Sequence, residues 1–98
     1  MTLDQFTDAI RQKTGTDSGL NAKVKFLIDG EQVVHVDATQ VPNVVSNENL
    51  ESDCLVRLSA ETLESVLGGK TNATMAFMMG KIKVDGNLGV AMNITKIL

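Results

Sequence analysis

The residues of this 98-residue chain best suited to nucleophilic or acid–base chemistry are its single cysteine, Cys54, and its single histidine, His35. His35 lies in an alternating segment in which Val34 and Val36 share one side, so we expect its imidazole on the solvent face of a strand. Cys54 has no strongly basic neighbour in sequence that would lower its pKa. We therefore predict that Cys54 is a structural thiol and that His35 is solvated. One cysteine and one histidine are also too few ligands for a zinc site.

Two glycine-containing motifs are typical of phosphate binding, and each has a simpler interpretation. Gly69-Lys70-Thr71 has the form of the end of a P-loop, but Glu64 stands where that motif needs its first glycine. We interpret the glycines at 68–69 as a helix stop. Gly86-Asn87-Leu88-Gly89 has the GXXG form of an RNA-binding loop without basic residues to hold phosphates, so we expect a tight strand-to-helix turn.

Net charge and the placement of the carboxylates argue against two further classes, nucleic-acid-binding proteins and acid–base enzymes. The formal net charge is −3 and the pI is near 4.9, which argues against nucleic acid as a partner. No carboxylate lies in an apolar run where burial would raise its pKa for acid–base work. We therefore predict a protein that is not an enzyme and that needs no cofactor and no metal.

Length and hydropathy predict one soluble globular domain over residues 1–98. With 43% hydrophobic and 21% charged residues, the chain resembles an ordinary globular domain, and it is too short for two. No apolar run approaches the roughly 20 residues of a membrane span. The N-terminal segment up to Lys13 is amphipathic and unlike a secretory signal, so we expect a cytoplasmic location.

Periodicity and turn residues predict an α+β fold with a single sheet and helices on one face. We expect a first helix with a Thr2–Gln5 capping box, a hairpin turning at Asp29-Gly30, and an N-cap at Ser59. The predicted helices cover residues 2–13, 60–67, 72–79 and 87–98, and the predicted strands cover 22–28, 31–38, 44–45, 54–58 and 81–85.

Methionine is unusually common near the end of this chain. Met75, Met78, Met79 and Met92 are four of its five methionines, and there is no Trp or Tyr. Methionine is flexible and polarizable, so it adapts to more than one packing arrangement. On composition alone, ordinary core packing is the simpler interpretation, and an apolar pocket is the alternative.

The C-terminal half resembles a known family. Residues 63–70 form a predicted helix ending in a Gly-Lys step, residues 76–84 read Ala-Phe-Met-Met-Gly-Lys-Ile-Lys-Val, and residues 86–89 turn into the last helix. In this order and spacing the motifs resemble the sterol carrier protein 2 family. The likeness covers about three quarters of the chain and is most specific from Ser59 onward; where many members have a second aromatic residue, this chain has Met78.

The resemblance implies a twisted, mainly antiparallel sheet of about five strands whose helices enclose an apolar tunnel. It also implies non-enzymatic intracellular binding and transfer of a small lipid: a fatty acid, a fatty acyl-CoA, a phospholipid or a sterol. Loading such a carrier implies transient contact with a membrane. The alternative function is a small regulatory or assembly module whose apolar surface packs on a partner protein.

The expected tunnel lining follows from the predicted faces of the strands and helices. Phe26, Ile28, Val34 and Val36 are expected to form its floor. The expected walls and lid are formed by Leu63, Val66, Leu67, Met75, Phe77, Met78, Leu88, Val90 and Met92. We expect the last helix, together with the short methionine-rich helix before it, to open as a lid.

Overall fold

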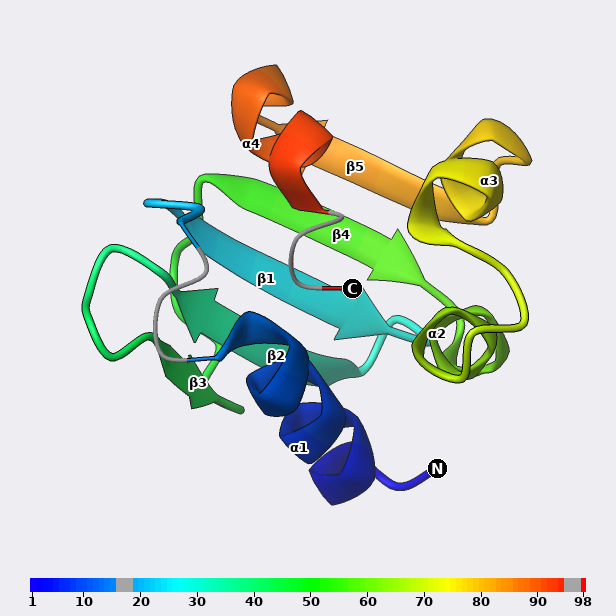
Figure 1. The fold of residues 1–98 in the computed structure, drawn as a ribbon, viewed down its shortest axis with the longest axis horizontal. Helices are drawn as coiled ribbons and strands as arrows, with labels where there is room; N and C mark the ends of the chain where they lie inside the picture. Colours follow the sequence, from blue (N-terminus) through cyan, green and yellow to red (C-terminus); the bar gives the residue numbers. More distant parts are fainter. Residues whose placement is uncertain (16–18, 95–97) are drawn as a thin grey trace.

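The fold is described from a computed structural model, which covers residues 1–15, 19–94 and 98. Five strands form one sheet in the order β3-β2-β1-β4-β5, and four helices accompany it (Figure 1). The elements are α1 (Leu3–Thr14), β1 (Lys23–Ile28), β2 (Gln32–Asp37), β3 (Val44–Ser46), β4 (Cys54–Leu58), α2 (Ala60–Leu67), α3 (Ala73–Met78), β5 (Ile82–Gly86) and α4 (Leu88–Asn93). The predicted α+β fold class is confirmed.

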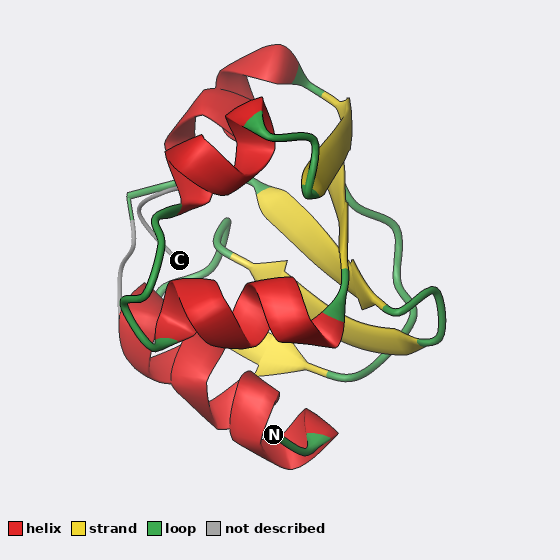
Figure 2. Cartoon of the chain, turned by 90° about the vertical axis from the view of Figure 1, so that its right-hand side faces the viewer, coloured by secondary structure: helices red, strands yellow, loops and turns green. Residues whose placement is uncertain are grey.

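The sheet is mainly antiparallel, with one parallel pair at its centre. β1 pairs antiparallel with β2 and parallel with β4, so that Phe26 lies opposite both Val34 and Val56. The helices lie on one face of the sheet, as predicted (Figure 2). The other face is covered in part by the loop over residues 47–53, which joins β3 to β4.

The hairpin turn and the helix starts are formed by local chemistry. Asp29 has φ 53° and Gly30 has φ 74°, and a type I′ turn requires such positive values. The Asp29 carboxylate also accepts a hydrogen bond from the backbone N–H of Ala60 at 2.9 Å, which connects the turn to the start of α2. Thr2 and Gln5 form the predicted capping box, and Ser59 caps α2 as predicted.

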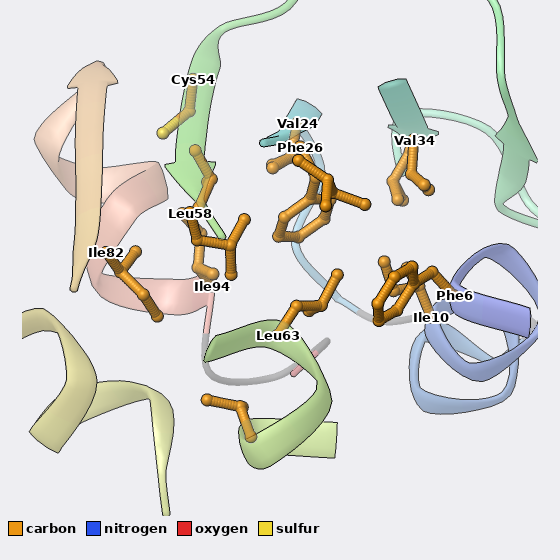
Figure 3. Packing of buried hydrophobic residues seen from close by; sticks show 14 of the residues in the cluster. Phe6, Ile10, Val24, Phe26, Val34, Cys54, Leu58, Leu63, Ile82 and Ile94 are labelled. Atoms are coloured by element: carbon orange, nitrogen blue, oxygen red, sulfur yellow. The ribbon is translucent and has the colours of Figure 1, made fainter. Parts of the chain in front are cut away.

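The core lies between the sheet and the helices (Figure 3). Phe6 and Ile10 of α1 and Leu63 of α2 are completely buried against the inward-facing strand residues. Because β-strand side chains alternate, these apolar residues cover only one face of β1 and β2. Every buried side-chain nitrogen and oxygen in the described part of the chain has a hydrogen-bond partner.

The expectation that His35 lies in solvent is wrong. Its side chain is only 2% exposed, and its Nε2 lies 2.9 Å from the carbonyl oxygen of Glu51. His35 does lie on the helix-free face, opposite Lys25 in the sheet. The 47–53 loop covers that face at this point, since Lys25 also donates a hydrogen bond to the side chain of Asn49.

The last helix is shorter than predicted. α4 ends at Asn93 rather than continuing to Leu98, and Ile94 closes it by donating its backbone N–H to the carbonyl of Ala91. A bond to the third residue back forms a tightened final turn. Residues 95–97 of the predicted helix lie outside the described residues.

The described helices are short. The longest, α1, has 12 residues, and within the described ranges no helix is long and apolar enough to cross a membrane.

Candidate functional site

The predicted floor residues lie together in the core. The side chains of Phe26, Ile28, Val34 and Val36 are fully buried on the helix-covered face of β1 and β2. Two of the predicted wall residues of α2, Leu63 and Val66, are buried in the same cluster. Two others are half-buried at its margin, Leu67 in α2 and Val90 in α4.

The remaining predicted wall and lid residues do not join the floor. Met75 and Phe77 are each 53% exposed. Met78 and Met92 are 79% and 80% exposed, so they project into solvent from α3 and α4. Leu88 begins α4, and its side chain lies outside the described part of the structure.

A cavity of about 640 Å³ lies where the end of α1, the end of α2 and the start of α3 meet. We call it the α2–α3 cavity. Its apolar lining comes from Val66, Ala73, Met75 and Leu98, and its polar lining includes Lys13 and Lys70. It is therefore an amphipathic cavity whose two charged side chains are both cationic.

A second cavity of about 640 Å³ lies between α1 and α2. We call it the α1–α2 cavity. Its lining includes Ala9, Leu67 and Lys70 but also two carboxylates, Glu61 and Glu64. The amino terminus forms an ion pair with Glu64 at 3.2 Å. This cavity therefore carries charges of both signs, unlike the α2–α3 cavity.

Sequence reasoning missed Lys13 and Leu98 as neighbours of Met75. Lys70 was noticed within the Gly-Lys-Thr motif and within the Gly-Lys step of the family resemblance, but not as a cavity residue. The structure does not support the P-loop interpretation, because the motif follows a helix. The α2–α3 cavity combines the end of α1, the α2–α3 connection and the final residue. No periodic pattern joins such distant segments, so only the folded structure could reveal them.

Two titratable groups in the described part of the chain have shifted pKa values. Burial raises the pKa of the Cys54 thiol, and the carboxylates of Asp85 and Asp53 raise it further, so Cys54 stays protonated and unreactive. The hydrogen bond from the Thr39 hydroxyl lowers the pKa of Asp37, the last residue of β2. Among the described residues, no group of three His, Cys, Asp or Glu side chains could hold a metal ion.

A family model matches nearly the whole chain, and curated relatives match about half of it. The family model described as the SCP-2 sterol transfer family matches residues 3–98. Sterol carrier protein 2 of Bos taurus is 33% identical over 55 residues, which make up 56% of this chain and 10% of that protein. Hydroxysteroid dehydrogenase-like protein 2 of Danio rerio is 33% identical over 49 residues, which make up 50% of this chain and 12% of that protein.

Solved structures share the fold. Sterol carrier protein 2 from Yarrowia lipolytica, in its apo form, matches with a TM-score of 0.68 and 24% identity, covering 96% of this chain and 85% of that one. Palmitated SCP2L2 from Aedes aegypti matches with a TM-score of 0.77 and 17% identity, covering 99% of this chain and 94% of that one. The matches to the curated relatives above span about a tenth of those proteins' own length.

Proposed function

The chain belongs to the SCP-2 sterol transfer family, and from that premise we propose that it binds a lipid and transfers it without covalent chemistry. The observation that carries this proposal is the family match over residues 3–98, which includes the hairpin, the sheet and both short C-terminal helices. Lipid transfer is also consistent with the protonated Cys54 thiol and the buried His35 ring, which leave neither residue free to react. The family match therefore favours a carrier over a partner-binding module.

We place the lipid first in the α2–α3 cavity. Its volume of about 640 Å³ falls in the range of about 300–1,000 Å³ that is typical of small-molecule sites. Val66, Met75 and Leu98 supply apolar contact surface for a hydrocarbon chain. Val66 also belongs to the buried cluster, so a chain that enters here lies next to the core.

The charges of the cavity favour a lipid with an anionic head group. Lys13 and Lys70 are its charged side chains, and either ammonium group can pair with a carboxylate or phosphate. The α1–α2 cavity suits such a head group less well, because Glu61 and Glu64 would repel it. Among lipids, a fatty acid, a fatty acyl-CoA or an acidic phospholipid therefore fits better than an uncharged sterol.

The tunnel over Phe26, Ile28, Val34 and Val36 is part of the same proposal. Side chains of α1 and α2 cover this floor, whereas α3 packs on β5 and α4 on β4. In the proposal, α3 and α4 open at that edge of the sheet to admit a hydrocarbon chain. Their exposed methionines, Met75, Met78 and Met92, would then turn inward and repack around chains of different shape. Leu63, Leu67, Phe77, Leu88 and Val90 complete the proposed lining.

The energetics suit a carrier that both holds and releases its ligand. Burial stabilises a hydrocarbon chain by about 0.8 kcal/mol per methylene, so a dozen methylenes contribute about 10 kcal/mol. Association costs roughly 4–15 kcal/mol in lost translational, rotational and internal freedom. We therefore expect moderate affinity, weak discrimination between chains one carbon apart, and exchange of the lipid during transient contact with a membrane.

A pair of substitutions tests where the lipid binds. Ala73 lines the α2–α3 cavity and Ala9 lines the α1–α2 cavity, and both are half-buried. We expect Ala73→Phe to fill its cavity and weaken binding of a fluorescent fatty acid to the delipidated protein at least tenfold. Ala9→Phe is the matched control and should bind as the wild type does. Equal binding by both variants would contradict the proposed site.

A further inference from the structure

The outer surface of α3 is apolar and faces solvent. Ala76 is the helix residue that packs into the core, with only 1% of its surface exposed. The α3 patch, as we define it, consists of Met75, Phe77, Met78 and Met79, which are 53%, 53%, 79% and 61% exposed. Met78 lies two residues from Ala76, about 200° around the helix, so it marks the middle of the outer side.

This surface is unusual for a helix at the edge of a protein. A surface helix normally carries charged or polar residues opposite its buried side, and a helix that is apolar all round is normally buried. The sequence of α3, ATMAFM, contains no charged residue. Figure 1 shows α3 at the periphery, beside the edge strand β5. Four large apolar side chains grouped on one exposed element mark an interaction surface.

The charged residues nearest the patch along the sequence are all cationic. Between Glu64 and Asp85 the sequence contains Lys70, Lys81 and Lys83 and no acidic residue. These three positive charges stand in a chain of net charge −3, so the rest of the chain carries −6. Lys70 precedes α3 and Lys81 follows it; the Lys81 backbone N–H donates to the carbonyl of Ala76 at 2.9 Å.

We propose that the α3 patch, with Lys70 and Lys81 on either side, docks on the surface of an anionic phospholipid bilayer. The apolar side chains would enter the boundary between head groups and acyl chains, and the lysines would pair with the phosphates and carboxylates of the lipids. Met75 belongs both to the patch and to the lining of the α2–α3 cavity. Docking through this patch would therefore bring that cavity to the membrane.

A second copy of the chain fits the patch less well than a bilayer does. In a two-fold symmetric contact, the same surface of each copy would face the other. The lysines of one copy would then face the lysines of its partner, and the repulsion would oppose the burial of the methionines. An anionic lipid surface gains from both the apolar and the cationic parts of the patch.

The absence of Trp and Tyr allows a direct measurement, because one introduced tryptophan is then the dominant fluorophore. We would place it at Phe77→Trp in the patch and, as the control, at Val41→Trp, which is 66% exposed and precedes β3 at the opposite edge of the sheet. Vesicles of equal parts phosphatidylcholine and phosphatidylserine should shift the emission of the first variant to shorter wavelength and leave the second unchanged. Vesicles of phosphatidylcholine alone should produce a much smaller shift.

Substitutions in the Phe77→Trp variant test the cationic and the apolar parts of the docking surface separately. Lys70→Gln combined with Lys81→Gln should lower the partition coefficient for the anionic vesicles about 30-fold. Met78→Gln should lower it at least about fivefold. Lys23→Gln removes one charge from an exposed residue of β1 and should have little effect. Circular dichroism checks that each variant is folded.

Three outcomes would overturn the proposal. The first is no shift of the Phe77→Trp emission on anionic vesicles. The second is an equal shift on neutral and anionic vesicles. The third is a shift that follows protein concentration without lipid, which would show that a second copy covers the patch. Because Phe77 also belongs to the proposed lipid lining, co-sedimentation with the vesicles is measured beside the emission to distinguish docking from uptake of single lipids. Failure to sediment with anionic vesicles overturns docking and leaves lipid binding in the cavity intact, and failure of lipid binding leaves the sedimentation test valid.

Discussion

Gly86 ends β5 in a backbone conformation that other residues rarely adopt. Its φ is 118°, and a Cβ at this position would press against the backbone carbonyl oxygen of Asp53. The close approach is needed because Cys54 pairs with Gly86 in the sheet, while Asn87 donates its backbone N–H to the carbonyl of Asp53 and caps α4. The predicted strand-to-helix turn is confirmed, and Asn87 is the N-cap of the helix that follows it.

Gly86→Ala should therefore destabilise the protein more than the same change at another glycine. We expect a loss of about 1–3 kcal/mol from strain and crowding together. Gly80→Ala is the matched control, because Gly80 also has a positive φ but a Cβ there would meet no atom within 4 Å. Urea unfolding of both variants measures the difference. Equal losses would show that the contact with Asp53 has no energetic consequence.

The Cys54 thiol gives a prediction for alkaline pH. Burial, with the nearby Asp85 and Asp53, raises its pKa in the folded state above the ordinary value of 9.0. A raised pKa adds stability that is complete below the pKa of the unfolded thiol and is lost as pH rises through the folded pKa. The unfolding free energy of the wild type should thus fall more steeply above about pH 9 than that of Cys54→Ala. Parallel curves for the two proteins would contradict this assignment.

His35 shows why single-residue predictions from periodicity can fail. Alternation assigned it correctly to the face opposite Val34 and Val36, but alternation carries no information about what covers that face. The 47–53 loop has no periodic pattern of its own. It covers this face through the Glu51 carbonyl, which contacts the His35 ring, and through Asn49, which accepts a hydrogen bond from Lys25. Cys54, by contrast, was predicted as a structural residue, and its burial confirms that interpretation.

Most elements could be predicted from sequence because their signals are local. The hairpin depends on Asp29 and Gly30, and the starts of α1 and α2 depend on Thr2 and Ser59; each signal lies directly beside the structure it specifies. The exposure of α3 could not be predicted in this way. Its periodicity fits a helix, but whether the methionines or Ala76 contact the core depends on how α3 packs on β5.

α4 is the helix that we expect to open as a lid over the proposed lipid site. This helix has six residues, and Ile94 at its end is buried while Met92 is 80% exposed. Short helices with few buried contacts open at low free-energy cost. We expect amide hydrogen exchange in Leu88–Asn93 to slow when a fatty acid is added, while exchange in β1 stays unchanged. Full protection of α4 without ligand, and no change with it, would contradict the lid.

In the whole molecule, the central strand pairing and the proposed lipid site are each formed by segments that lie far apart in sequence. The central β1–β4 pair is parallel and joins Val24 to Cys54, a pairing that no local signal specifies. The α2–α3 cavity joins Lys13, Lys70 and Leu98. The resemblance to the sterol carrier family predicted the fold that brings these segments together, but not which side chains line the cavity.

The central claim, that this chain carries a lipid with an anionic head group, is tested most directly by native mass spectrometry of the protein as purified from cells. The account predicts a monomer carrying one bound molecule, which solvent extraction identifies as a fatty acid, an acyl-CoA or an acidic phospholipid. Delipidated protein should regain that mass when palmitate is added, and Ala73→Phe should retain much less of it. A protein that is consistently free of lipid, and that takes up no palmitate after delipidation, would contradict the account.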